Sequence, residues 1–118
     1  MKKLENRLHA LQESLEAKKA MDVVLLDLRP LSVEVDAFLI CHGTSLRHVK
    51  ALCEAAREKL KKIGDSVFLT EGLEEGNWVL MDCGDFLVHI FNEKSREFYR
   101  LEDLWSHASV IKPMAPSA

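Results

Sequence analysis

A chain of 118 residues with 47% hydrophobic and 30% charged side chains has the size and balance of one soluble domain. At this length roughly two thirds of the unfolded surface can be buried, so a core needs no disulfide or metal support. The formal net charge of −3 gives no large positive field, which argues against a protein that binds phosphate groups by charge alone.

The cysteines and the N-terminal residues indicate a cytoplasmic protein. Cys41, Cys53 and Cys83 are odd in number and lack C-x-x-C spacing, which disfavours a disulfide framework or a structural zinc site. The N-terminal residues are charged where a signal peptide needs an apolar run. No apolar run exceeds five residues, far below the roughly 20 that span a bilayer, so we expect no membrane segment.

In chain order, the first predicted elements are one helix and two strands. Leucines at helical spacing predict an amphipathic helix over residues 3–19. Two short apolar runs, residues 23–26 and 37–41, predict strands that are buried on both faces.

A second helix follows Gly43. Thr44 or Ser45 can cap it, and Gly64 can end it. Its apolar stripe comprises Val49, Leu52, Cys53, Ala56, Leu60 and Ile63.

The remaining predicted elements are three strands and a helix. Residues 67–69 predict a third strand, and residues 77–82 and 86–91 predict a β-hairpin. Asn92 can cap a final helix over about residues 93–105. Its inner side is predicted to carry Phe98, Leu101, Leu104 and Trp105. The order αββαβββα predicts a single α/β (α+β) domain over residues 1–110, with a mixed five-stranded sheet, flanking helices and a short flexible tail over 111–118.

The predicted hairpin has two chemically different faces. With a turn at Cys83-Gly84, Trp78 lies opposite His89, Leu80 opposite Leu87, and Asp82 opposite Asp85. The alternate residues Val79, Met81, Phe86, Val88 and Ile90 form the core face.

Two interpretations of the face with Trp78 remain open. Trp78 can pack under the last helix while the aspartates make local hydrogen bonds in the turn. Alternatively, Trp78 and Leu80 anchor a protein interface in which Asp82 and Asp85 engage basic groups. The charge distribution is compatible with both interpretations. Residues 65–107 hold 10 acidic and 3 basic side chains, which form either a solvated surface or a surface that binds a basic partner.

Signals for catalysis are weak. The Gly43-Thr44-Ser45 turn resembles that of nucleotidyltransferases, but no D-x-D carboxylate pair follows to hold divalent cations, and ordinary helix capping explains the turn better. The spacing of Cys41, His42, His48 and Cys53 matches no known metal site, so we expect packing roles for the cysteines and neither a metal nor a cofactor. His89 lies between apolar residues and favours a structural role over that of a catalytic base.

Several motifs, in order and spacing over residues 4–107, resemble those of the Iojap-like ribosomal silencing factors. They are DVVLLDL (22–28), DAFLICHGTSLRHV (36–49), EGLEEGNWVLMD (71–82), GD (84–85), VHIF (88–91) and REFYRLEDLW (96–105). Pro30 and Cys83 depart from the family pattern, which affects loop details only.

The resemblance implies a non-enzymatic factor with a nucleotidyltransferase-like fold that lacks the catalytic carboxylates. Such a factor binds the fourteenth protein of the large ribosomal subunit and blocks joining of the small subunit, which lowers translation when nutrients are scarce. The implied contact residues are Trp78, Leu80, Asp82, Asp85, His89, Arg96 and Tyr99. The resemblance implies no sequence-specific contact with nucleic acid, and the free protein is expected to form a homodimer through the same apolar patch.

Overall fold

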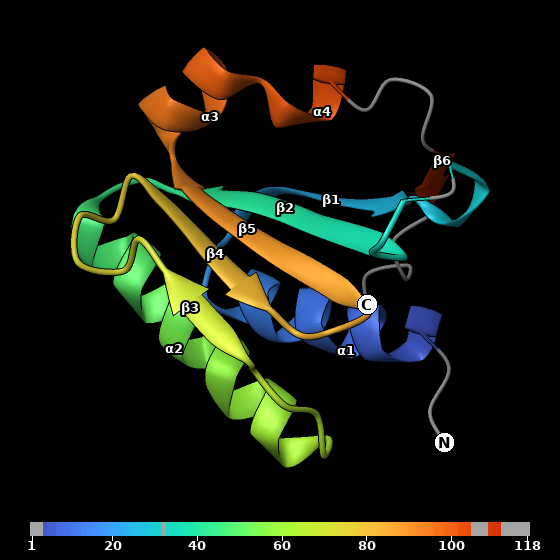
Figure 1. The fold of residues 1–118 in the computed structure, drawn as a ribbon. Coiled ribbons are helices and arrows are strands. Elements are labelled where there is room, and N and C mark those ends of the chain that lie inside the picture. Colours follow the sequence, from blue (N-terminus) through green and yellow to red (C-terminus); the bar gives the residue numbers. More distant parts are fainter. Residues whose placement is uncertain (1–3, 32, 105–108, 112–118) are drawn as a thin grey trace.

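A computed structural model describes residues 4–31, 33–104 and 109–111 (Figure 1). Its helices are α1 (Leu4–Ala17), α2 (Leu46–Lys62), α3 (Glu93–Tyr99) and α4 (Leu101–Leu104), with a short 3-10 turn, η1, at Arg29–Leu31. Its strands are β1 (Met21–Asp27), β2 (Ala37–Gly43), β3 (Leu69–Glu71), β4 (Trp78–Asp82), β5 (Phe86–Asn92) and β6 (Ser109–Ile111).

The strands form one mixed sheet in the order β3-β4-β5-β2-β1-β6. β2 and β5 are parallel at its centre, and all other neighbours are antiparallel. The five predicted strands and the mixed sheet are confirmed. The sixth strand, β6, was not predicted; it pairs with β1, with Leu25 opposite Ile111, one residue beyond the predicted domain boundary. Residues 112–118 of the predicted tail lie outside the described residues.

Helices cover both faces of the sheet (Figure 1), with α1 and α2 on one face and α3 and α4 on the other. Alternation along β2 divides its side chains between two buried clusters: Ala37, Leu39 and Cys41 join the cluster under α1 and α2, and Phe38 and Ile40 join the other. β2 is buried throughout, as predicted. In β1, Leu25 and Leu26 are buried as predicted, but Val23 and Val24 are only half-buried. No helix among the described residues is long and apolar enough to cross a membrane.

The boundaries of α2 follow from its capping residues. The hydroxyl of Ser45 accepts a hydrogen bond from the backbone N–H of His48 at 3.0 Å, which confirms the predicted cap. At the other end, Gly64 has a φ of +84°, and the N–H of Asp65 bonds back to the carbonyl of Leu60 at 2.8 Å. The Gly43-Thr44-Ser45 turn therefore serves as a helix entry.

The last predicted helix and the third strand differ from expectation. Asn92 caps α3 as predicted, but the helix breaks at Arg100, whose φ is +47°, so residues 93–105 do not form one continuous helix. Phe98 is 80% exposed, so its predicted inward orientation was wrong, whereas Leu101 is buried as expected. The side chain of Leu104 and all of Trp105 lie outside what the structure describes. β3 pairs over residues 69–71, two residues later than predicted.

Candidate protein-binding face

The candidate face is the side of β4 and β5 turned away from α1 and α2. On the opposite side, Val79, Met81, Phe86, Val88 and Ile90 are fully buried, as the alternation predicts. The pairing register, however, differs from the predicted one by two residues: Trp78 lies opposite Phe91, Leu80 opposite His89, and Asp82 opposite Leu87. Because the shift is an even number of residues, the side chains of the two paired strands keep their predicted faces.

The register follows from the turn. Cys83 pairs with Phe86 through a 3.0 Å backbone hydrogen bond, so the two turn residues are Gly84 and Asp85 rather than Cys83 and Gly84. Gly84 has a φ of +90°, which suits glycine at the first position of a two-residue hairpin turn. The carboxylate of Asp82 accepts the N–H of Gly84 at 2.8 Å and stabilises the turn.

Trp78 lies at the centre of an aromatic cluster on this face. Its ring stacks on Phe91, with ring centroids 5.0 Å apart, and is covered by Tyr99 at 4.8 Å. Its indole N–H donates a 3.0 Å hydrogen bond to Nδ1 of His89. Trp78 is only half-buried and Tyr99 is 46% exposed, so this cluster belongs partly to the core and partly to the surface.

His89 lies beneath Trp78 and is only 4% exposed. Its ring meets Phe38 edge-on, with centroids 4.5 Å apart. Burial lowers the pKa of His89 to about 4, so the ring is neutral at pH 7. Because Nδ1 accepts the indole N–H, the proton lies on Nε2, which is buried and finds no hydrogen-bond partner among the described residues. The structure therefore favours the predicted structural role.

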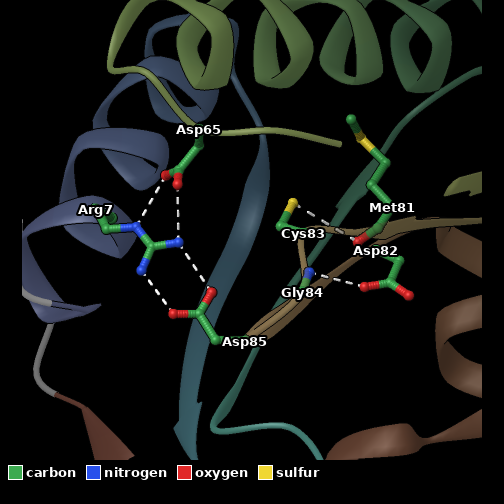
Figure 2. Close-up of polar contacts among 7 residues, drawn as sticks. All are labelled: Arg7, Asp65, Met81, Asp82, Cys83, Gly84 and Asp85. Carbon is green, nitrogen blue, oxygen red and sulfur yellow. Dashed lines mark hydrogen bonds and ion pairs between the residues drawn. The ribbon is translucent and has the colours of Figure 1, made fainter. Parts of the chain in front are cut away.

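Asp82 and Asp85 do not face each other, and their predicted opposition was wrong. The Asp85 carboxylate turns toward α1, where both of its oxygens accept hydrogen bonds from Arg7 at 2.6 and 2.9 Å (Figure 2). The same guanidinium contacts Asp65 at 2.9 Å and lies over the ring of Phe86. The two carboxylates raise the pKa of Arg7 further above its usual range. No local sequence pattern indicates this ion-pair cluster, because its members come from three distant segments.

Arg96 supports α3 from beneath. It is only 8% exposed, and its guanidinium donates to the carbonyl of Met21 at 3.2 Å and to Nδ1 of His42 at 3.0 Å. Arg96 therefore fastens α3 to β1 and β2, while Tyr99, one turn later, covers Trp78.

The described residues offer little for catalysis. All three cysteines are buried without disulfides, and burial raises their pKa values to about 12, so they are poor nucleophiles; Cys41 and Cys53 act in packing as predicted. The His48 ring has structural partners on both nitrogens: Nδ1 accepts the N–H of Thr44 at 2.9 Å, and Nε2 contacts the carbonyl of Lys18, just after the end of α1, at 2.8 Å. No group of three His, Cys, Asp or Glu side chains that could hold a metal occurs in the part of the chain that the structure describes.

Comparison with known proteins identifies relatives along nearly the whole chain. Residues 1–117 match the family described as "Ribosomal silencing factor during starvation". The chain is 41% identical over 91 residues to the ribosomal silencing factor RsfS of Bacillus subtilis, covering 77% of each chain. It is 32% identical over 97 residues to the chloroplast protein Iojap of Zea mays, covering 80% of this chain and 41% of that relative. It superposes on the crystal structure of protein CV0518 from Chromobacterium violaceum with a TM-score of 0.85 and 33% identity, covering 98% of this chain and 92% of that one.

Proposed function

The chain belongs to the ribosomal silencing factor family, as its motifs predict, and on this premise we propose that it binds the large ribosomal subunit through its fourteenth protein. Bound there, the domain sterically blocks joining of the small subunit and represses translation when nutrients are limiting. This action occurs in the cytoplasm and requires no bond to be made or broken.

The observation that supports this proposal most directly is the half-buried aromatic cluster on the β4–β5 face. Trp78 and Tyr99 combine large apolar area with exposed edges, and Leu80 and Asp82 continue the same face along β4. Aromatic side chains of this kind dominate protein interfaces energetically, whereas rim charges steer the encounter. We assign direct contact with the ribosomal protein to these four side chains.

The other three residues implied by the resemblance act indirectly in this proposal. His89 holds the indole of Trp78, and Arg96 holds α3, which carries Tyr99. Asp85 fixes the hairpin turn through Arg7. Substituting any of these three would weaken binding by moving the contact residues.

Co-sedimentation with isolated large and small subunits tests the proposal. We expect the native protein to bind the large subunit only, Tyr99→Ala to weaken binding tenfold or more, and Asp82→Asn to slow association at low salt. Asn can still accept the Gly84 N–H, so Asp82→Asn removes charge and keeps the turn.

The matched control is Glu58→Gln on the exposed side of α2, which should bind as the native protein does. Binding to neither subunit, or native affinity in a folded Tyr99→Ala variant, would reject the proposal.

We further propose that the free protein forms a homodimer through this face. Phe98 is 80% exposed beside Tyr99, with ring centroids 5.1 Å apart, and pairing of two copies would bury both rings. Light scattering at several concentrations should show a dimer that Phe98→Ser weakens. A monomer at all concentrations would refute the dimer but would not contradict the proposed binding to the large ribosomal subunit.

A further inference from the structure

A basic hollow lies at the edge of the sheet, between the second half of α2 and residues 67–70. Its volume is about 370 Å³, within the range of sites that hold small ligands. The residues that matter for its chemistry are Arg57, Lys61, Asp65, Phe68 and Thr70.

The charge of the hollow is positive. Arg57 and Lys61 lie one helical turn apart, both exposed, and neither forms an ion pair with a described residue. The carboxylate of Asp65 is already paired with Arg7 at 2.9 Å, so it does not neutralise them. Arg57 donates to the hydroxyl of Thr70 at 3.3 Å, which directs its guanidinium across the hollow.

Phe68 provides an exposed ring beside these cations. Its side chain is 71% exposed, yet its position is fixed. Its backbone N–H donates to the carbonyl of Asp82 at 2.8 Å, and its ring edge lies so close to Gly84 that a Cβ there would come within 3.0 Å. The helix dipole accounts for lysines in the last turn of α2, but not for a large exposed ring next to them. Cations flanking an exposed aromatic ring are the combination with which proteins bind single-stranded nucleic acid.

We propose that this hollow binds a single-stranded segment of RNA in the large ribosomal subunit. Arg57 and Lys61 bind phosphate oxygens, and Phe68 stacks on a base. This inference rests on the proposed function, which brings the chain to a particle made largely of RNA. The hollow lies on the α2 side of β3, around the edge of the sheet from the β4–β5 face, and the two are separated only by β3, where Leu69 pairs with Asp82 of β4. A ribosomal protein bound to that face would bring its surrounding RNA to the hollow.

Fluorescence anisotropy with a labelled 12-nucleotide oligouridine probe tests the contact directly. The double variant Arg57→Gln/Lys61→Gln should raise Kd at least tenfold and reduce the slope of log K against log salt by about 1.4, the value for two lost phosphate contacts. The control Arg47→Gln/Lys50→Gln removes the same charges from the other end of α2, where both residues are also exposed, and should change Kd less than twofold. Equal losses in the two variants, or no binding by the native protein, would overturn the proposal.

Substitutions of Phe68 test stacking separately from charge. Phe68→Leu keeps an apolar side chain but removes the aromatic face, and should weaken binding at least about fivefold, the low end for one stacked base. Phe68→Trp should retain native affinity. Native affinity in Phe68→Leu would exclude stacking and overturn the proposed mode of binding.

A second pair of measurements separates this inference from the proposed function. Arg57→Gln/Lys61→Gln should bind the isolated, RNA-free ribosomal protein as the native chain does, but bind the whole large subunit at least fivefold more weakly. Loss of affinity for the isolated protein as well would place the hollow in a protein interface and overturn the RNA assignment, as would unchanged affinity for the subunit. If the native chain fails to bind the isolated protein while the oligouridine results hold, the proposed function fails and the RNA site stands.

Discussion

The indole N–H of Trp78 donates to Nδ1 of His89 across two neighbouring strands at 3.0 Å, which fixes both the indole position and the histidine tautomer. Trp78 is thereby part of the interior and part of the candidate binding face. Its substitution affects folding as well as binding, and the first prediction measures the folding part alone.

Trp78→Phe should lower the free energy of unfolding by about 1–3 kcal/mol, because it leaves Nδ1 of the buried His89 without its donor. The phenyl ring retains much of the stacking on Phe91. Urea unfolding at pH 7 measures the change, and Tyr99→Phe, which keeps a ring in place over Trp78, is the control. A loss below about 0.5 kcal/mol would mean that the hydrogen bond contributes little.

The protein should lose stability as the pH falls from about 6.5 to about 4. The pKa of His89 is lowered from 6.5 to about 4 in the folded protein, so within this window the unfolded chain binds a proton that the folded protein does not. No stability is lost through His89 above pH 6.5, and the loss reaches about 3 kcal/mol by pH 4. Denaturant unfolding at pH 7, 5.5 and 4 measures it.

His89→Asn provides the comparison for that pH series. Its amide oxygen can accept the indole N–H but does not titrate, so the variant should show a flatter dependence between pH 6.5 and 4. Parallel pH curves for the two proteins would contradict the assignment to His89.

Removing the Arg7 guanidinium should destabilise the fold. Arg7→Gln leaves Asp65 and Asp85 close together without their shared cation, and the Arg7 and Asp65 side chains are only 15% and 17% exposed. We expect a loss of about 1–3 kcal/mol in urea unfolding. A double-mutant cycle with Asp65→Asn should give a coupling energy above 0.5 kcal/mol. Additive effects would show that the contacts are energetically independent.

Gly84→Ala should destabilise the protein more than Gly64→Ala does. Both glycines have φ values near +90°, at +90° and +84°, so both variants incur a backbone penalty of about 1–2 kcal/mol. Only at Gly84 does the new Cβ also meet the Phe68 ring, at 3.0 Å, whereas nothing lies within 4 Å at Gly64. Thermal unfolding of the pair isolates the contact with Phe68. Equal losses would mean that the ring moves aside freely.

The faces of the hairpin could be predicted from sequence, but its register could not. Alternating apolar residues assign faces under any even shift, so Met81 and Val88 were placed correctly despite the wrong turn. The choice between two turn positions depends on the left-handed backbone at Gly84 and the bond from its N–H to Asp82, which composition does not reveal.

Contacts between distant segments could not be predicted from the sequence either. Arg7 lies on the polar side of a helix, and nothing local indicates that it contacts Asp65 and Asp85. The helix breaks at Arg100, where the sequence has no glycine or proline to indicate a break. Helical periodicity was therefore extended through residue 105, which placed the exposed Phe98 on the inner side of the predicted helix. Hydrophobic periodicity therefore predicted the helix and sheet layers. It did not predict the ion pairs between distant segments or the position at which the last helix ends.

The parallel pairing of β2 with β5 determines when this chain can fold. Its two central strands are separated in sequence by α2, β3 and β4, and Ala37 meets Phe86 only after that whole crossover is in place. During synthesis, α1, β1, β2 and α2 emerge with one edge of β2 unpaired, and the centre of the sheet cannot form until residue 92 has left the exit tunnel. The β4–β5 hairpin pairs residues close in sequence and supplies the missing neighbour of β2, so the candidate binding face and the centre of the core form together.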